Sequence, residues 1–134
     1  MKKILLDTNA YVRFLAGDRE VLAGLATAGI VYMSVVVLGE LYAGFRGGKK
    51  EVANRKVLEQ FLSKPTVRVL EVTQETSEVF GEVKALLKKT GTPLPINDVW
   101  IAAHALETGT VLFTYDRHFQ KVPGVRLWER VFAD

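Results

Sequence analysis

Short apolar runs alternate with longer segments of helical periodicity, and this alternation restricts the fold more than any other feature of the chain. Because strands that alternate with helices in sequence usually pair in parallel, we predict an α/β fold around a mostly parallel sheet. The valines at 35–37 favour a strand locally, so the start of the helix after Ser34 stays open. Strands are expected over residues 4–6, 30–33, 67–72, 111–114 and 125–128. Helices are expected over residues 9–16, 18–28, 73–89 and 98–107, from Ser34 to Phe45, and between the polar break at 47–50 and Pro65.

The length of 134 residues fits one domain, residues 1–134, since domains most often have about 100–150 residues. The chain has no cysteine, which excludes disulfides, thiolate metal sites and a cysteine nucleophile. The net charge of +3 is only a weak indication of a polyanionic partner. The longest apolar stretch, 29–45, is interrupted by Ser34 and Glu40, and no signal peptide is visible. We therefore expect a cytoplasmic protein without membrane contact.

Four acidic residues occur in surroundings where an uncompensated charge is costly. They are Asp7 in ILLDTNAYV, Glu40 in SVVVLGELYAGF, Asp98 in PLPINDVWIAAHA and Asp116 in VLFTYDRHF. Taken singly, the three aspartates have ordinary explanations as helix caps or turn residues. Glu40 is harder to explain, because its neighbours are almost wholly apolar. A cation shared by all four would account for them together.

The expected strands and helices place these acids at one edge of the sheet. Asp7 directly follows the first strand, Asp116 lies just past the 111–114 strand, and Asp98 begins a helix. Glu40 lies in the helix after Ser34 and can reach the same edge from the side. Ligands of open parallel sheets bind at the carboxyl ends of the strands, so we expect the four carboxylates to converge there.

Converging carboxylates raise one another's pKa, and a cation compensates their charge. A ligand set made only of oxygen favours Mg²⁺ or Mn²⁺, and such a site suits hydrolysis of a phosphodiester. The hydroxyls of Thr8 and Thr114 are candidates to contact a bound water or a phosphate. Asn9 and Asn97 are candidates to hold the carboxylates in place.

The remaining polar residues give weaker indications. His104 lies among apolar residues of a helix, so we expect a core or interface histidine, and His118 is expected in a solvated loop. Basic residues near the expected site would steer a phosphate backbone toward the acids. The candidates for contacts with a phosphate backbone or a partner are Arg46, Lys49, Lys50 and Arg117.

The four acidic segments, in this order and over nearly the whole chain, resemble the PIN-domain family, and within it the VapC-like toxins of toxin–antitoxin pairs. The resemblance is carried by LLDTNAYV, SVVVLGELYAGFRGG, PINDVWIAAHA and LFTYDRHF. It implies a three-layer α/β/α sandwich around a roughly five-stranded sheet. It also implies Mg²⁺- or Mn²⁺-dependent endoribonuclease activity, with the four acids as catalytic residues and metal ligands. An RNA substrate, a homodimer and a cognate antitoxin that covers the active site are further implications.

Three other functions stay open at this point. A related nuclease could act in RNA processing or quality control instead of as a toxin. Asp7 at the end of the first strand also suits a phosphatase with an aspartyl-phosphate intermediate, although Asn9 stands where such phosphatases usually carry a second aspartate. The acids could also serve only the structure of a non-catalytic RNA- or protein-binding scaffold.

Overall fold

The computed structural model describes residues 2–128 and shows, within them, six α-helices, five strands and a 3₁₀ turn. The predicted α/β fold is confirmed. The strands are β1 (Lys2–Leu6), β2 (Ala28–Ser34), β3 (Val67–Leu70), β4 (Val111–Phe113) and β5 (Arg126–Leu127). The helices are α1 (Thr8–Leu15), α2 (Arg19–Ala26), α3 (Val35–Phe45), α4 (Glu51–Leu62), α5 (Gln74–Thr90) and α6 (Ile96–Thr108), and the 3₁₀ turn η1 covers Arg117–Lys121.

The five strands form one sheet in the order β3-β2-β1-β4-β5, and every neighbouring pair is parallel. The first strand is therefore the central one: Leu5 pairs with Tyr32 of β2 on one side and with Leu112 of β4 on the other. Its apolar run, Ile4 to Leu6, is fully buried. The strand order reverses direction at β1, so the crevice between the ends of β1 and β4 is where such sheets bind ligands.

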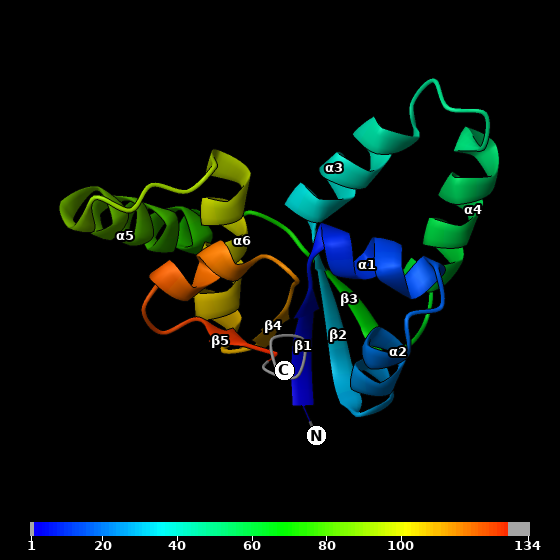
Figure 1. Ribbon diagram of the computed structural model, residues 1–134, viewed down its shortest axis with the longest axis horizontal. Coiled ribbons are helices and arrows are strands. Elements are labelled where there is room, and N and C mark those ends of the chain that lie inside the picture. Colours follow the sequence, from blue (N-terminus) through cyan, green and yellow to red (C-terminus); the bar gives the residue numbers. More distant parts are fainter. Residues whose placement is uncertain (1, 129–134) are drawn as a thin grey trace.

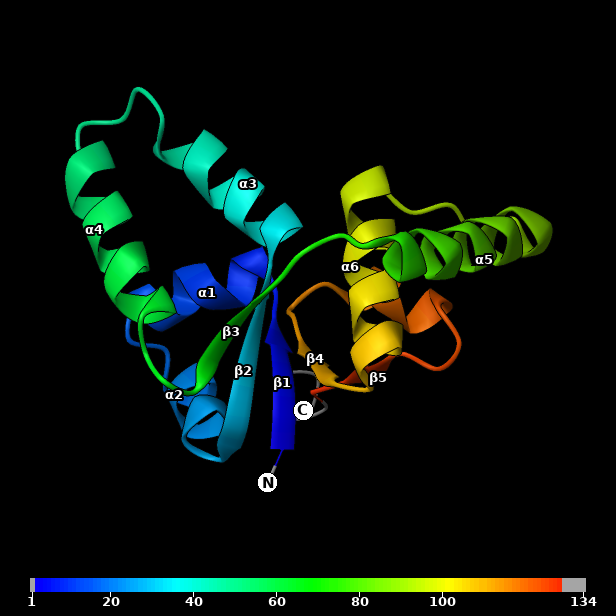
Figure 2. The ribbon, with the colours of Figure 1, turned by 180° about the vertical axis from the view of Figure 1, so that it is seen from behind.

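Helices cover both faces of the sheet, which confirms the predicted three-layer sandwich. The helices α1, α2 and α4 lie on one side of β1, whereas α5 and α6 lie on the other side (Figures 1 and 2). The carboxyl ends of β1 and β2 point toward the starts of α1 and α3 (Figure 1). None of the described helices combines the length and the hydropathy needed to cross a membrane.

Side-chain caps fix where several helices begin. Ser34 accepts a hydrogen bond from the backbone of Val36, so α3 starts directly after β2 despite three β-branched residues in its first turn. Residues 35–37, which the sequence left open between strand and helix, are therefore helical. Thr73 and Thr76 form a reciprocal capping box at the start of α5, and Gly91 ends that helix with a φ of 69°.

Some predicted boundaries were wrong by a few residues. The second helix ends at Ala26, not at residue 28, because the Thr27 hydroxyl bonds to the Gly24 carbonyl and Ala28 already pairs with β1. The helix predicted over 98–107 begins two residues earlier, at Ile96, and ends one residue later, at Thr108. The strand predicted over 67–72 stops at 70, where its partner β2 also ends, and the last strand is shorter than the predicted 125–128.

Candidate active site

Asp7 is the most deeply buried of the four predicted acids, with 5% of its surface exposed. It caps α1, and its Oδ1 accepts a hydrogen bond of 2.8 Å from the backbone of Thr8. Its Oδ2 accepts a hydrogen bond of 2.7 Å from the Thr114 hydroxyl. The pKa of Asp7 is raised to about 6, chiefly by burial; the two hydrogen bonds oppose this rise, and the charges of Asp98 and Glu40 add to it. Both carboxylate oxygens of Asp7 are thus held in a fixed orientation.

Thr114 and Asn9 join the end of β1 to the segment that follows β4. Besides donating to Asp7, the Thr114 hydroxyl accepts a hydrogen bond of 3.0 Å from the backbone of Asp116. The Asn9 amide donates to the same hydroxyl at 3.5 Å, and its Oδ1 accepts from the backbone of Tyr115 at 3.1 Å. The sequence placed Thr114 and Asn9 beside the acids, and the structure brings them together there.

Glu40 reaches the same edge from α3. It is half-buried, and its Oε1 accepts a hydrogen bond of 2.9 Å from the hydroxyl of Thr8, the residue next to Asp7. Its negative charge contributes to the raised pKa of both Asp7 and Asp98. The prediction that Glu40 folds back toward Asp7 therefore agrees with the structure.

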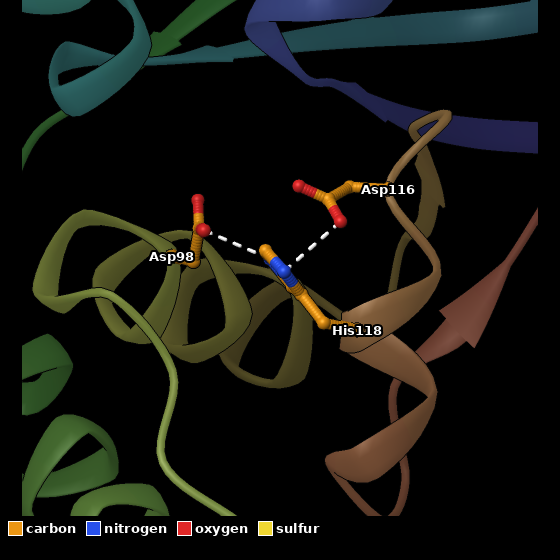
Figure 3. A group of neighbouring side chains, drawn as sticks. All are labelled: Asp98, Asp116 and His118. Carbon is orange, nitrogen blue, oxygen red and sulfur yellow. Dashed lines mark ion pairs between the residues drawn. The ribbon is translucent and has the colours of Figure 1, made fainter.

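Asp98 and Asp116 face each other across the ring of His118 (Figure 3). His118 Nε2 lies 2.8 Å from Asp98 Oδ2, and Nδ1 lies 2.9 Å from Asp116 Oδ1. Burial raises the pKa of Asp98, the charge of His118 lowers it, and the charges of Asp116 and Glu40 raise it again. The expectation of a solvated loop position for His118 was wrong, because η1 turns this side chain toward the acids and leaves it only 26% exposed.

The chemistry of this group fits a divalent cation. Oxygen ligands from four carboxylates lie at one edge of the sheet, and their mutual repulsion contributes to the raised pKa of Asp7 and Asp98. The ligand atoms of Asp98, Asp116 and His118 lie within 4.8 Å of one another. His118 Nε2 is buried against Asp98 Oδ2 in a poorly aligned contact, so a cation bound here would replace the proton between the two groups.

The other predicted site residues are exposed to solvent. Asn97 is exposed, and no hydrogen bond joins its side chain to the acids within the described part of the chain. The exposed Arg46, Lys49 and Lys50 belong to the loop between α3 and α4, at the end of α3 that points away from the sheet (Figure 1). Arg117 is exposed and directly follows Asp116.

His104 is the fully buried histidine expected from the sequence. Its Nδ1 lies 3.0 Å from the Ser34 hydroxyl, and its Nε2 lies 3.0 Å from the carbonyl oxygen of Glu71. The ring therefore joins α6, which carries Asp98, to the start of α3, which carries Glu40. The prediction of a hydrogen-bonded core histidine is confirmed.

Comparison with known proteins identifies the family. The model of the PIN domain matches residues 4–125. The chain belongs to the PIN-domain family. This PIN-domain protein is 33% identical over 129 residues to Ribonuclease VapC2 of Haemophilus influenzae, and the match covers 94% of the chain and 96% of that relative. It is 30% identical to the tRNA(fMet)-specific endonuclease VapC of Salmonella typhimurium, with 95% of the chain and 97% of that relative covered.

Solved structures agree with this assignment. The structure of VapBC2 from Rickettsia felis, bound to a DNA fragment from its promoter, includes a chain that matches this PIN domain with a TM-score of 0.83 and 26% identity. The match covers 93% of this protein and 96% of that chain. The predicted resemblance to the VapC-like members of the family is confirmed.

Proposed function

We propose that this PIN-domain protein is a metal-dependent endoribonuclease and the toxin of a VapBC-type toxin–antitoxin pair. The observation that carries the proposal is the group of Asp7, Glu40, Asp98 and Asp116 at the carboxyl edge of the parallel sheet. Hydrogen bonds through Thr8 and Thr114 link Asp7 to Glu40 and to the Asp116 backbone, and His118 contacts both Asp98 and Asp116. Relatives named as VapC ribonucleases, matched over nearly their whole length, support the same activity.

The four carboxylates are the residues that would hold the cofactor, Mg²⁺ or Mn²⁺. When bound, such an ion activates water, clamps a phosphate oxygen and stabilises the leaving oxyanion. The protein's own contribution is orientation: Thr114 and the Thr8 backbone fix the carboxylate of Asp7, and the Thr8 hydroxyl fixes that of Glu40. Fixed ligands lose little freedom when substrate binds, which favours the reaction.

The substrate and partners follow from the relatives. The Salmonella typhimurium protein is named as acting on tRNA(fMet), and several solved neighbours are VapBC complexes, so RNA and a small antitoxin are the proposed partners. We also propose a homodimer. Arg46, Lys49, Lys50 and Arg117 are proposed contacts for RNA or antitoxin, since all four are exposed cations.

The phosphatase alternative fits the site less well. The carboxylate of Asp7 is almost fully buried, which leaves little room for in-line attack on a phosphate, and Asn9 stands where such phosphatases usually carry a second aspartate. The intact group of acids likewise disfavours a non-catalytic scaffold, because like charges held together without a ligand destabilise the fold.

The decisive test is RNA cleavage by single carboxylate-to-amide variants. Asp98→Asn should lower the cleavage rate by at least about 100-fold, because it removes a ligand while keeping the side-chain volume. Asp18→Asn is a matched control, because Asp18 caps α2 outside the acidic group. EDTA should abolish the activity of the unmodified protein, and added Mg²⁺ or Mn²⁺ should restore it. Full cleavage by Asp98→Asn, or cleavage that persists in EDTA, contradicts the proposal.

A further inference from the structure

The position of His118 within the acidic group is not explained by a site made only of carboxylates. Its ring lies between Asp98 and Asp116, and each nitrogen faces one carboxylate (Figure 3). The two nitrogens differ, however. Nε2 is buried and has no hydrogen-bond partner among the described residues, although it lies 2.8 Å from Asp98 Oδ2. The contact with Asp98 is close but poorly aligned for a hydrogen bond, so a cation placed between Nε2 and Asp98 Oδ2 would replace the proton that the two groups share.

This arrangement matches the way proteins orient a histidine on a metal. A metal-binding histidine almost always directs its other ring nitrogen at a carboxylate or carbonyl, which fixes the ring. Here Asp116 Oδ1 lies 2.9 Å from His118 Nδ1, so Asp116 is the carboxylate that fixes the ring. The other ring nitrogen, Nε2, then lies beside the Asp98 carboxylate, where both atoms can contact one ion.

The spacing of the two remaining ligand atoms also fits one ion. Two ligands at right angles around an ion, with bonds of about 2.1 Å, lie about 3.0 Å apart. Nε2 and Asp98 Oδ2 are 2.8 Å apart, so a small outward movement would place both on the same ion. The side chain of His118 is 26% exposed, which leaves it room for that movement.

We propose that His118 Nε2 is a metal ligand beside Asp98, and that this nitrogen makes the site prefer Mn²⁺ to Mg²⁺. The proposal rests on the proposed function, in which the acidic group holds a divalent ion, and it adds the choice of ion. Mg²⁺ takes oxygen ligands and gives up its water reluctantly, whereas imidazole nitrogen suits transition-metal ions. A site with one nitrogen among carboxylates therefore favours Mn²⁺, the transition-metal ion that also accepts carboxylate and water.

Electron paramagnetic resonance of bound Mn²⁺ tests the ligand directly. The full chain is loaded with MnCl₂, and pulsed measurements record whether a ¹⁴N nucleus is coupled to the ion. The unmodified protein should show this coupling, and His118→Asn should lose it while keeping its circular dichroism spectrum. Because the unmodified protein already gives a positive or negative result, the test does not depend on how the variant folds.

The preference for Mn²⁺ is measured by titration. The Mn²⁺ affinity comes from the signal of the free ion, and the Mg²⁺ affinity from competition by MgCl₂. His118→Asn should weaken Mn²⁺ binding by about tenfold or more, by analogy with the loss of groups around metal sites. Mg²⁺ binding should change much less, since the oxygen ligands remain.

Three outcomes would overturn the proposal: no ¹⁴N coupling in the unmodified protein, equal weakening of both ions, or tighter binding of Mn²⁺ by the variant. Tighter binding would mean that His118 acts as an internal cation which the ion must displace. These outcomes leave the nuclease proposal intact, because RNA cleavage and its loss in Asp98→Asn are measured separately. Conversely, a protein that binds Mn²⁺ through nitrogen yet cleaves no RNA would refute the proposed function alone.

Discussion

Replacing Asp7 by asparagine should stabilise the metal-free protein at neutral pH, even though it is expected to abolish cleavage. Burial raises the pKa of Asp7 from 3.8 to about 6, a shift of about two units. Each unit corresponds to about 1.4 kcal/mol, so the ionised carboxylate lowers the free energy of unfolding by about 3 kcal/mol at pH 7.5. This cost is present above the folded-state pKa and vanishes as the pH falls below 3.8, where Asp7 is neutral in both states.

The substitution also loses part of a hydrogen bond. The Thr114 hydroxyl donates to Asp7 Oδ2 and already accepts from the backbone of Asp116. An amide group facing that hydroxyl pairs less well, which costs about 1 kcal/mol. The net gain is about 2 kcal/mol, or about 8 °C in melting temperature for a domain of this size.

The assay is thermal unfolding of both proteins in EDTA from pH 4 to pH 7.5. Asp7→Asn should melt higher at pH 7.5, and the difference should shrink as the pH falls below 6 and reverse slightly by pH 4, where the cost of the lost hydrogen bond exceeds the small gain that remains. Asp18→Asn is a control with the opposite expected result. Hydrogen bonds from the Val21 and Glu20 backbones and from the Arg13 side chain lower the pKa of Asp18, so its ionised form stabilises the fold. The Asp18→Asn variant should therefore melt at a lower temperature than the unmodified protein. A lower melting temperature for Asp7→Asn at pH 7.5, or a difference that does not depend on pH, refutes the reasoning.

Two further substitutions test the scaffold of the site. Thr114→Val keeps the shape of a fully buried side chain but leaves Asp7 Oδ2 without its hydrogen bond. It should lower the free energy of unfolding in urea by about 1–3 kcal/mol, with strongly reduced cleavage; an unchanged urea midpoint contradicts this. Gly24→Ala should cost about 1–3 kcal/mol, because a Cβ there would lie 2.5 Å from the ring of Phe113. The control is Gly39→Ala, where a Cβ meets nothing within 4 Å; equal melting temperatures for the two variants would show that the Phe113 ring moves aside freely.

The convergence of the acids could be predicted because it depends on the ends of strands. Asp7 directly follows β1 and Asp116 follows β4 by a few residues, and neighbouring parallel strands bring these positions to one edge whatever the detailed packing. The side chains of Asn9 and Thr114 are close to the same strand ends, so their hydrogen bonds follow from the same register. The alternation of strands and helices predicts the parallel sheet and therefore the edge where the strand ends meet, whereas the strand order comes from the structure.

The role of His118 could not be predicted in the same way, because it depends on a short 3₁₀ turn without periodicity. One signal was present: Phe119, the next residue, is apolar and fully buried in the structure. A buried anchor at this position holds the turn against the core and directs its neighbour toward Asp98 and Asp116. The boundary errors near Thr27 and Pro95 have a different cause, since hydrogen-bond competition at the ends of helices involves only a few residues.

The central place of β1 affects how this protein is made. β1 is synthesised before both of its sheet neighbours, and its second partner, Val111–Phe113, follows β2 only after four helices and another strand have been made. Asp7 receives the hydroxyl of Thr114 only after that late strand is available. The acidic group of a nascent chain therefore cannot be assembled until β4 and Thr114 have been synthesised and paired with β1.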